Sequence, residues 1–446
     1  MKKQRLLALI LSIILILLPL SSATVEAAEL PDVDATAYVV MDATDGEILL
    51  QKNSKKRIYP ASTAKLLTAV TALDNAGTGR KIKTTQKVLD TIPSDSSQLF
   101  LPAGCTYKMG TYLNMLLISS SADAAVTLAS GTCGSATKFI KKMNTTAKKI
   151  GMKNSHFDNP MGLDKGNGYN KTYSTAYDMA LLSRYAMSYS PIRNIVSRET
   201  YKISASGKYK GTTLKNTNKL LANEDSTNSY TIIGTKTGST RAAGKCLIAT
   251  AIDDAGHEVI CAYFGATSST NLYQGVDALL DYTFEECADN LSVNFFDTRY
   301  IKESKTILKY ASSGILKGTA KGAFYPYKKM TEKTFSTLVA SISGEALPFP
   351  GKDKEMTALK LAKYYVKSYT VSVSDTQLKK YQSLMKENTK NYSKLSSEEV
   401  TMLAAMYANK LLTSSYGYNV NATFTKAQTV TVGDKIVTFQ SALQQQ

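Results

Sequence analysis

Histidine is almost absent from this chain, because only His156 and His257 occur among its 446 residues. A histidine-rich metal site is therefore excluded, since such a site needs several imidazole ligands. A Ser-His-Asp triad would depend on His156, because His257 lies in a predicted turn. The turn-forming neighbours of His156 favour a residue that organises its loop by hydrogen bonding over a catalytic base. This scarcity leaves lysine as the stronger candidate for a base.

Cysteine is also scarce, with five residues and no CxxC or other metal-binding spacing. An odd number of thiols cannot all pair within one chain, so a complete disulfide framework is not predicted. Cys246 and Cys261 lie in two runs typical of neighbouring strands, which would bring them near one another. We predict that the protein uses no metal or other cofactor.

Acidic residues are outnumbered, with 36 Asp and Glu against 54 Lys and Arg and a formal net charge of +18. Such a balance suits an anionic partner, which would be nucleic acid, a membrane surface or an acidic cell-wall polymer. It also fits a surface that is simply rich in lysine. The length is sufficient for two or three domains with cores of their own.

The N-terminus selects among these partners. Lys2, Lys3 and Arg5 precede an apolar run over 6–18, and small residues follow as far as Ala27. This pattern is typical of a secretory signal peptide cleaved after Ala27, with an uncleaved N-terminal anchor as the alternative. Export argues against nucleic acid as a partner. We predict a secreted protein that is extracellular and associated with the cell wall or outer surface.

Strand patterns lie at both ends of the first domain. The runs 37–42 and 47–50 are joined by the hairpin turn Asp45-Gly46, and a second hairpin joins 245–252 to 258–264. The segment between them contains helical patterns, while residues 80–105 have none and are expected to be irregular. Helices are predicted over 62–75, 109–129, 174–187 and 269–287. The simplest arrangement is an α/β (α+β) fold in which the two sets of strands share one antiparallel sheet and a helical lobe is inserted.

Ser62 and Lys65 begin the first of these helices, directly after Pro60. Residues i and i+3 share one helix face, so the hydroxyl and the amine can point into the same space. A serine needs a base to become a nucleophile, and a desolvated lysine with a lowered pKa can serve as one. Two other Ser-x-x-Lys matches begin at Ser135 and Ser383, in lysine-rich stretches typical of solvated helix faces. The spacing alone therefore does not identify the site.

Two later segments also carry polar groups in unusual places. Ser119-Ser120-Ser121 interrupts the predicted helix over 109–129, either as a helix boundary with a serine cap or as hydroxyls that face a cleft. Lys236-Thr237-Gly238 follows an apolar pair at the beginning of the C-terminal strands.

In chain order, Ser62-x-x-Lys65, the serines around Ser120 and Lys236-Thr237-Gly238 resemble the Ser-x-x-Lys, Ser-x-Asn and Lys-Thr-Gly signature of penicillin-binding proteins and serine β-lactamases. Residues 35–285 are similar to the D-alanyl-D-alanine carboxypeptidases, which are low-molecular-weight penicillin-binding proteins of the serine-peptidase group. The flanking segments that carry this likeness are Tyr59–Thr63, Ser155–Leu163, Tyr173–Asp178, Asn216–Leu221 and Thr235–Thr240. The resemblance implies the transpeptidase-like fold that β-lactamases and penicillin-binding proteins share.

The resemblance also implies a reaction, the removal of the terminal D-Ala from a peptidoglycan stem peptide that ends in D-Ala-D-Ala. Ser62 attacks the penultimate carbonyl, Lys65 takes the proton of Ser62, and Ser120 completes the catalytic group. The backbone amides of Ser62 and Ser239 would form the oxyanion hole. β-Lactam antibiotics are the implied acylating inhibitors.

The implied substrate-binding residues are Lys236, Thr237, Gly238 and Ser239. They lie together on one predicted strand. Lys236 and Thr237 would hold the terminal carboxylate of the substrate from the edge of the sheet.

One position departs from the family pattern. Aligning Asp123-Ala124 with the Asp-Ala that follows the asparagine of the family makes the second motif Ser120-Ser121-Ala122. The missing amide normally helps to position the lysine and the peptide carbonyl, so its loss would cost a few kcal/mol of transition-state stabilisation. Ser119 or Ser121 would then fill part of the gap.

Two other functions are weighed against the carboxypeptidase. A weakly catalytic or non-catalytic penicillin-binding or wall-attachment protein is the alternative, because of Ala122. A β-lactamase would need a deacylating carboxylate loop, and the sequence shows none. We predict a signal peptide over 1–27, a D,D-carboxypeptidase domain over 28–287 and a mainly helical accessory region over 288–446.

The accessory region contains a helix–loop–helix pattern over 307–335 that resembles a degenerate S-layer-homology repeat. The Arg and Glu that follow the threonine in those repeats are Glu332 and Thr334 here. A second trace is predicted over 403–412 with Phe424 and 431–435. The resemblance implies binding to an anionic cell-wall polymer, and a plain helical accessory domain is the alternative.

Overall fold

A computed structural model describes residues 29–164, 169, 171–222, 228–293, 295–319, 323–344, 354–368, 371, 373–389, 392–413, 419 and 421–444. The predicted signal peptide therefore lies outside the described residues. Contacts divide the chain into two units, Met1–Asp32 and Val33–Gln446, and all elements below belong to the second. No helix within the described ranges combines the length and the apolar character that crossing a bilayer requires.

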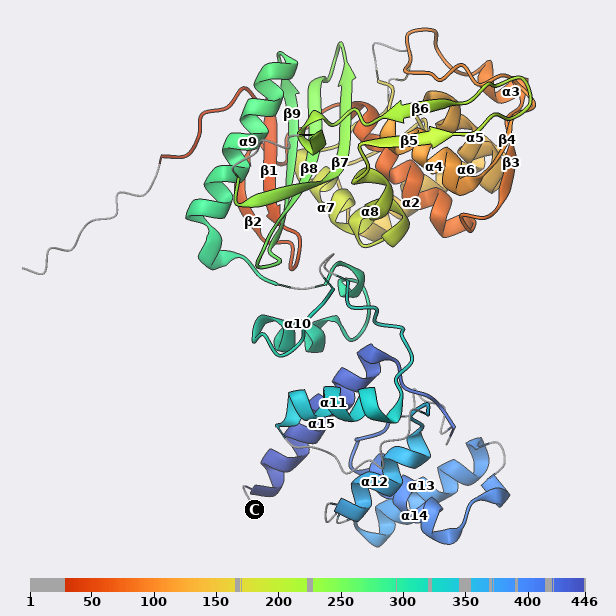
Figure 1. Ribbon diagram of the computed structural model, residues 1–446, viewed down its shortest axis with the longest axis vertical. Helices are drawn as coiled ribbons and strands as arrows, with labels where there is room; N and C mark the ends of the chain where they lie inside the picture. Colours follow the sequence, from red (N-terminus) through yellow and green to blue (C-terminus); the bar gives the residue numbers. More distant parts are fainter. Residues whose placement is uncertain are drawn as a thin grey trace, which may run out of the picture. The chain divides into compact units, whose positions relative to one another are not determined.

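Five antiparallel strands form the main sheet in the order β2-β1-β9-β8-β7 (Figure 1). They are β1 (Ala37–Asp42), β2 (Ile48–Lys52), β7 (Tyr230–Thr240), β8 (Gly244–Asp253) and β9 (Glu258–Ala266). Strand β1 pairs with β9, with Tyr38 opposite Tyr263. The prediction that the N- and C-terminal strands share one antiparallel sheet is confirmed.

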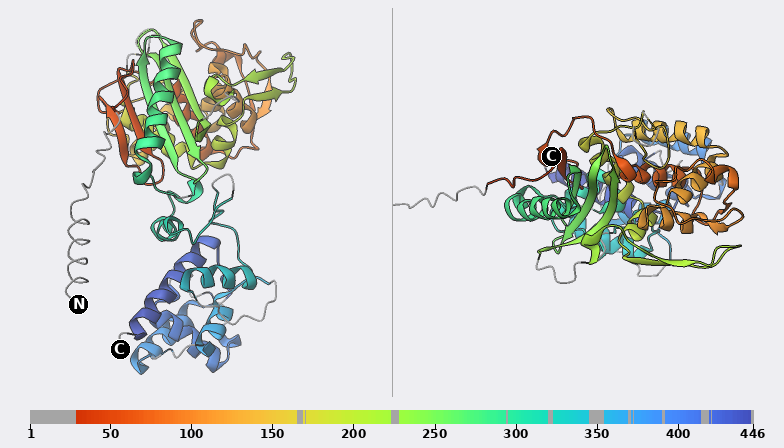
Figure 2. Two further views of the ribbon diagram at one scale, coloured as in Figure 1. Left: turned by 60° about the vertical axis from the view of Figure 1, so that its left-hand side comes forward. Right: turned by 90° about the horizontal axis from the view of Figure 1, so that it is seen from above.

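Helices cover both faces of this sheet (Figure 2). One face carries α9 (Ser269–Glu286), and the other carries the lobe inserted between β2 and β7. The helices of the lobe are α2 (Lys65–Asn75), α4 (Met109–Ile118), α5 (Ala122–Cys133), α6 (Ala136–Ile150), α7 (Ala176–Met187) and α8 (Ser190–Val196). Residues 80–105, which were expected to be irregular, contain β3 (Lys81–Lys83) and α3 (Gln86–Leu89). Strand β3 pairs with β4 (Thr106–Lys108), and β5 (Thr200–Ile203) pairs with β6 (Thr212–Lys215).

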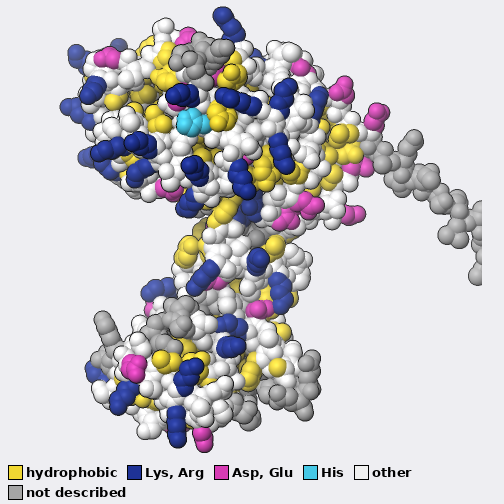
Figure 3. Space-filling view, turned by 180° about the vertical axis from the view of Figure 1, so that it is seen from behind, with side chains coloured by type: hydrophobic (Ala, Val, Ile, Leu, Met, Phe, Trp, Pro, Cys, Tyr) yellow, Lys and Arg dark blue, Asp and Glu magenta, His cyan; other side chains and the backbone are white. Residues whose placement is uncertain are grey.

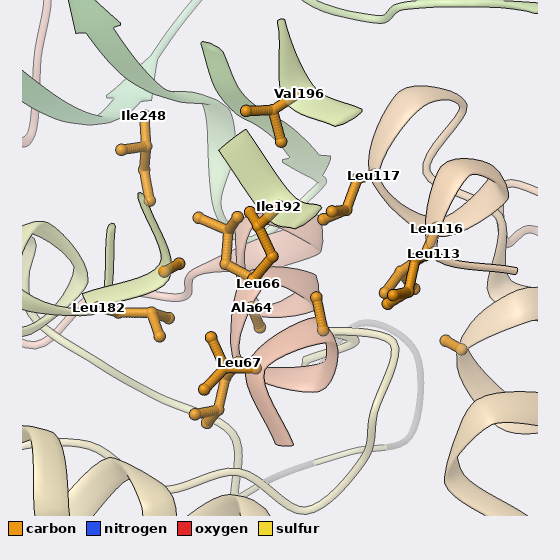
Figure 4. Close-up of a cluster of buried hydrophobic side chains, with 14 of the residues drawn as sticks. Ala64, Leu66, Leu67, Leu113, Leu116, Leu117, Leu182, Ile192, Val196 and Ile248 are labelled. Atoms are coloured by element: carbon orange, nitrogen blue, oxygen red, sulfur yellow. The ribbon is translucent and has the colours of Figure 1, made fainter. Parts of the chain in front are cut away.

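Helix α2 is buried along its first two turns, from Lys65 to Ala72. Figure 4 shows Leu66 and Leu67 of α2 among apolar side chains of the neighbouring helices, including Leu113 and Ile192. Truncation of such a buried leucine to alanine costs about 2–5 kcal/mol. This packing holds the start of α2 rigidly, which is what a reactive group placed there requires.

The two cysteines of the C-terminal strands lie in different cores. Cys246 of β8 packs in the core between the sheet and the helical lobe. Cys261 of β9 lies opposite Ala249 and packs in the core beneath α9. Their side chains point to opposite faces of the sheet, because alternate residues of a strand do so. The expectation that they lie near one another is therefore wrong, and both thiols are free.

The segment that follows α9 contacts the main sheet. The buried carboxylate of Asp42 accepts a hydrogen bond from the backbone amide of Ser292 at 2.7 Å. Glu258, also buried, forms ion pairs with Arg193 and Arg299, each with an N–O distance of 2.9 Å. Burial by itself raises the pKa of Glu258, but the two guanidinium groups outweigh it and hold this pKa at about 2. The domain boundary after residue 287 stays a prediction.

The accessory region is helical in its described parts. Its helices are α10 (Ser304–Ser312), α11 (Glu332–Ser343), α12 (Ala358–Ser368), α13 (Asp375–Asn388), α14 (Ser397–Ala408) and α15 (Lys426–Gln444). Three short extended segments, 329–331, 355–357 and 423–425, lead directly into α11, α12 and α15. Each segment forms a β-bridge with each of the other two, so the three close into a ring. Thr331, Thr357 and Thr425 hold equivalent places in this three-segment ring, each directly before a helix. The likeness to S-layer-homology repeats stays a prediction.

Basic side chains are spread over the surface. Figure 3 shows Lys and Arg distributed across one face of the molecule, with Asp and Glu less frequent there. The excess of positive charge is therefore not confined to one cluster on this face.

Candidate active site

Ser62 and Lys65 are brought together by a tight turn at the start of α2. Ser62 lies in the 3₁₀ turn η1 (Ala61–Ala64), and Lys65 is the first residue of the α-helix. Side chains three residues apart nearly eclipse one another in 3₁₀ geometry, which brings them closer than an α-helix would. The Lys65 ammonium nitrogen is 2.7 Å from the Ser62 hydroxyl oxygen. The predicted nucleophile and base are therefore within hydrogen-bond distance.

Strand β7 lies directly against this turn, and Gly238 permits the approach. A Cβ atom at Gly238 would lie 3.1 Å from the backbone nitrogen of Ser62. On the other side, a Cβ at Gly162 would lie 2.0 Å from the carbonyl oxygen of Ala61. Ala61 itself adopts a left-handed conformation with φ of 49°. The backbone at Ser62 is thus confined between β7 and the loop that contains Gly162.

The environment of Lys65 disfavours its charge. The side chain is 2% exposed, and this burial lowers the pKa of Lys65 to about 7, against the opposing effect of the Asp123 carboxylate. A substantial share of the amine is therefore neutral at neutral pH. A neutral amine next to a serine hydroxyl can accept its proton.

Lys236 is equally buried, with 1% exposure. Burial and, second, the neighbouring Lys65 lower the pKa of Lys236 well below its ordinary value. Its ammonium nitrogen donates to the carbonyl of Thr237 at 3.0 Å. Burial beside Lys65 thus disfavours the charged form of Lys236.

A cavity of about 400 Å³ opens in front of Ser62 and Lys65. Hydroxyl groups and one exposed guanidinium, that of Arg241, supply much of its polar lining. The residues that line it are Ser62, Lys65, Asp95, Ser96, Ser97, Ala122, Met161, Leu163, Ser239, Thr240 and Arg241.

A model of the D-alanyl-D-alanine carboxypeptidase family matches residues 24–268, which is more than half of the chain. The chain belongs to this family. Lys65 and Gly238, which were predicted from the Ser-x-x-Lys and Lys-Thr-Gly motifs, both lie against Ser62 in the structure.

Curated relatives and solved structures agree with this family. The D-alanyl-D-alanine carboxypeptidase DacF of Bacillus subtilis is 33% identical over 257 residues, which are 57% of this chain and 63% of DacF. DacC of Escherichia coli is 30% identical over 60% of this chain and 65% of DacC. This chain thus spans less than two thirds of the length of these two relatives.

Two solved structures show the fold. The DD-transpeptidase of Streptomyces K15 has a TM-score of 0.53 at 28% identity, covering 58% of this chain and 99% of its own. Penicillin-binding protein 6B of E. coli has a TM-score of 0.52 at 28% identity, covering 58% of this chain and 80% of its own. The predicted transpeptidase-like fold is confirmed.

The structure places only part of the predicted substrate-binding group at the cavity. Ser239 lines it, and Gly238 lies against the backbone of Ser62. Lys236 and Thr237 do not line it, and the Thr237 hydroxyl is hydrogen-bonded to that of Thr217 at 2.6 Å. Of the four predicted binding residues, Ser239 lines the cavity, Gly238 contacts Ser62, and Lys236 and Thr237 are not among the lining residues.

Of the predicted serine motif Ser120-Ser121-Ala122, only part lines the cavity. Ser120 is buried, with a left-handed φ of 62°, between α4 and α5, and it does not line the cavity. Ala122, in the place of the asparagine, does line it. Ser119 donates to the carbonyl of Met115, and Ser121 caps α5 while donating to Asp123. Neither neighbouring serine therefore supplies the missing amide, contrary to the expectation.

Both histidines lie away from the cavity lining. The backbone of His156 bridges to that of Tyr173, which fits the predicted loop-organising role. His257 pairs with Asp253 at 2.7 Å. Four lining residues were not predicted from the sequence, although the serine-rich stretch after Pro93 was a signal for some of them: Asp95, Ser96, Ser97 and Arg241.

Proposed function

We propose that this protein is a serine-type D-Ala-D-Ala carboxypeptidase that acts on peptidoglycan stem peptides through an acyl-enzyme on Ser62. The observation that carries the proposal is the contact of 2.7 Å between Ser62 and Lys65 at the edge of the cavity. Membership of the family supplies the reaction class. The lowered pKa of Lys65, about 7, fits the role of a general base near neutral pH.

The proposed reaction begins when the Lys65 amine takes the proton of Ser62. The serine oxygen attacks the carbonyl carbon of the penultimate D-Ala, and the negative charge moves to the carbonyl oxygen. The close approach of β7 at Gly238 supports an oxyanion hole made by the backbone amides of Ser62 and Ser239. Lys65 then returns its proton to the departing D-Ala amine, and water hydrolyses the ester. A β-lactam would acylate Ser62 by the first of these steps.

Recognition of the terminal carboxylate is assigned to the Ser239 end of β7. Arg241 lines the cavity there, and a guanidinium stays charged under all ordinary conditions. Lys236 is buried, burial lowers its pKa, and it is not among the lining residues, so we assign this contact to Arg241.

The test is D-Ala release from a peptide ending in D-Ala-D-Ala, with the purified protein beside its Ser62→Ala variant. Release by the unchanged protein and none by the variant is the expected result. Stoichiometric labelling by a fluorescent penicillin without release would instead favour the alternative, a weakly catalytic or non-catalytic penicillin-binding protein. Absence of both signals would contradict any active-serine function.

We also propose that the accessory region binds an anionic cell-wall polymer, which fits a secreted, wall-associated protein. The supporting observation is an exposed aromatic and basic stretch. Tyr325 is 57% exposed and Tyr327 is 71% exposed, and the exposed Lys328 and Lys329 follow them. Exposed aromatic rings can stack on sugar rings, and lysines attract anionic groups.

Sedimentation of the full chain with purified cell walls tests this second proposal. The double variant Tyr325→Ala and Tyr327→Ala should remain in the supernatant, while the unchanged protein sediments. Unchanged sedimentation of the variant would contradict the role of this stretch.

A further inference from the structure

The segment 95–101 is held by hydrogen bonds next to Ala122, the position where the family motif has an asparagine. The backbone amide of Ala122 donates to the carbonyl of Ser97 at 2.8 Å, and the Ser97 hydroxyl donates to the carbonyl of Ser119 at 3.3 Å. The buried carboxylate of Asp123 accepts from the backbone amides of Leu99 and Leu101, both at 2.9 Å. These contacts fix the segment against the start of α5.

Ser96 lies within this fixed segment and lines the cavity together with Lys65 and Ala122. Its hydroxyl oxygen is buried, and it forms no hydrogen bond to any residue that the structure describes. Buried hydroxyls in proteins are nearly always paired. A hydroxyl can both donate and accept a hydrogen bond, as an asparagine amide does with two separate atoms.

Three other hydroxyls near Ala122 are already engaged. Ser119 and Ser121 bond within their own helices or to Asp123, and Ser97 bonds to a backbone carbonyl. Of these four serines of the loop and the helix start, Ser96 is the one whose hydroxyl has no partner among the described residues, and a turn of its side chain would bring that hydroxyl to a ligand in the cavity.

We propose that Ser96 takes over the positioning role of the missing asparagine. Its hydroxyl hydrogen-bonds the carbonyl of the stem peptide on the side of the cavity opposite β7, and so aims the scissile bond at Ser62. This inference rests on the proposed carboxypeptidase function. In this proposal Ser96 is a substrate-contacting residue that lies on a loop. The family motif instead places its substrate-contacting asparagine at the start of a helix.

The first experiment compares Ser96→Ala with Ser94→Ala in the full chain. Ser94→Ala is the matched control, because it removes an exposed hydroxyl next to the same loop and outside the cavity lining. We expect kcat/KM for D-Ala release to fall roughly tenfold or more in Ser96→Ala and by less than about threefold in Ser94→Ala. Ser96→Thr should recover most of the activity. Thermal unfolding of all variants should agree within a few degrees.

The second experiment adds the amide back. In a protein with Ala122→Asn, the further substitution Ser96→Ala should have little effect on kcat/KM, because the introduced amide and the Ser96 hydroxyl would bond the same substrate carbonyl. The effects of the two substitutions should therefore be strongly non-additive. Equal kcat/KM for Ser96→Ala and Ser94→Ala would overturn the proposal, as would a loss in Ser96→Ala that Ala122→Asn leaves unchanged. If the unchanged protein neither releases D-Ala nor reacts with penicillin, the carboxypeptidase function fails first and this inference fails with it.

Discussion

The burial of Lys65 predicts a specific pH dependence for the first chemical step. A base must be neutral to accept a proton, so kcat/KM should rise with pH as Lys65 loses its own proton. With a pKa of about 7, the neutral fraction is about 1% at pH 5, about 10% at pH 6 and about 90% at pH 8. An ordinary lysine, with a pKa near 10.5, would be less than about 0.1% neutral at pH 7. Burial thus makes the base about a thousandfold more available at neutral pH.

The assay is the initial rate of D-Ala release at substrate concentrations well below KM, from pH 5 to pH 9 at constant ionic strength. Because kcat/KM reports groups of the free enzyme, the rising limb should have its midpoint near pH 7. Labelling of Ser62 by a fluorescent penicillin should follow the same curve, since it needs the same proton transfer. A flat profile between pH 5.5 and 8.5, in protein that stays folded throughout, would refute the assignment of Lys65 as base.

Three further predictions concern packing and charge. Gly238→Ala should lower kcat at least tenfold with little loss of stability, because the new Cβ would lie 3.1 Å from the Ser62 nitrogen and displace the backbone there. An unchanged kcat would contradict this prediction. Glu258→Gln should destabilise the protein by about 3–5 kcal/mol in urea unfolding, because it leaves two buried arginines without a counter-charge. The control Glu355→Gln, in the exposed ion pair with Lys329, should cost less than about 0.5 kcal/mol. Arg241→Ala should raise KM roughly tenfold for a peptide with a free carboxylate and leave KM unchanged for the C-terminal amide.

The sequence predicted what depends on neighbouring residues. The Ser62–Lys65 contact follows from a spacing of three residues, and the helix limits at Asn75 and Thr175 follow from breakers and caps. The antiparallel sheet follows from two hairpins whose alternation and turn residues are local. Even here the turn type differed, since Ser62 lies in a 3₁₀ turn that precedes the α-helix.

What the sequence could not predict depends on contacts between distant segments. Ser96 reaches the cavity because Asp123, more than twenty residues away, holds its loop in place. The lowered pKa of Lys236 results from its burial and, second, from the neighbouring Lys65, and the residues around Lys236 in the sequence predict neither. The binding role of Lys236 was implied by the family resemblance and stays a prediction, while Arg241 was recognised only from the lining of the folded cavity.

The closed ring of 329–331, 355–357 and 423–425 has a consequence for how the accessory region comes apart. In a linear array of repeats each unit contacts only its neighbours, so an end can unravel while the rest persists. Here the last segment bridges back to the first, so there is no terminal unit to fray. If one of the three segments came loose together with the helix that follows it, its bridges to both of the other segments would break. The region should therefore lose its structure in a single cooperative transition, and a cut ahead of α15 should collapse the whole region.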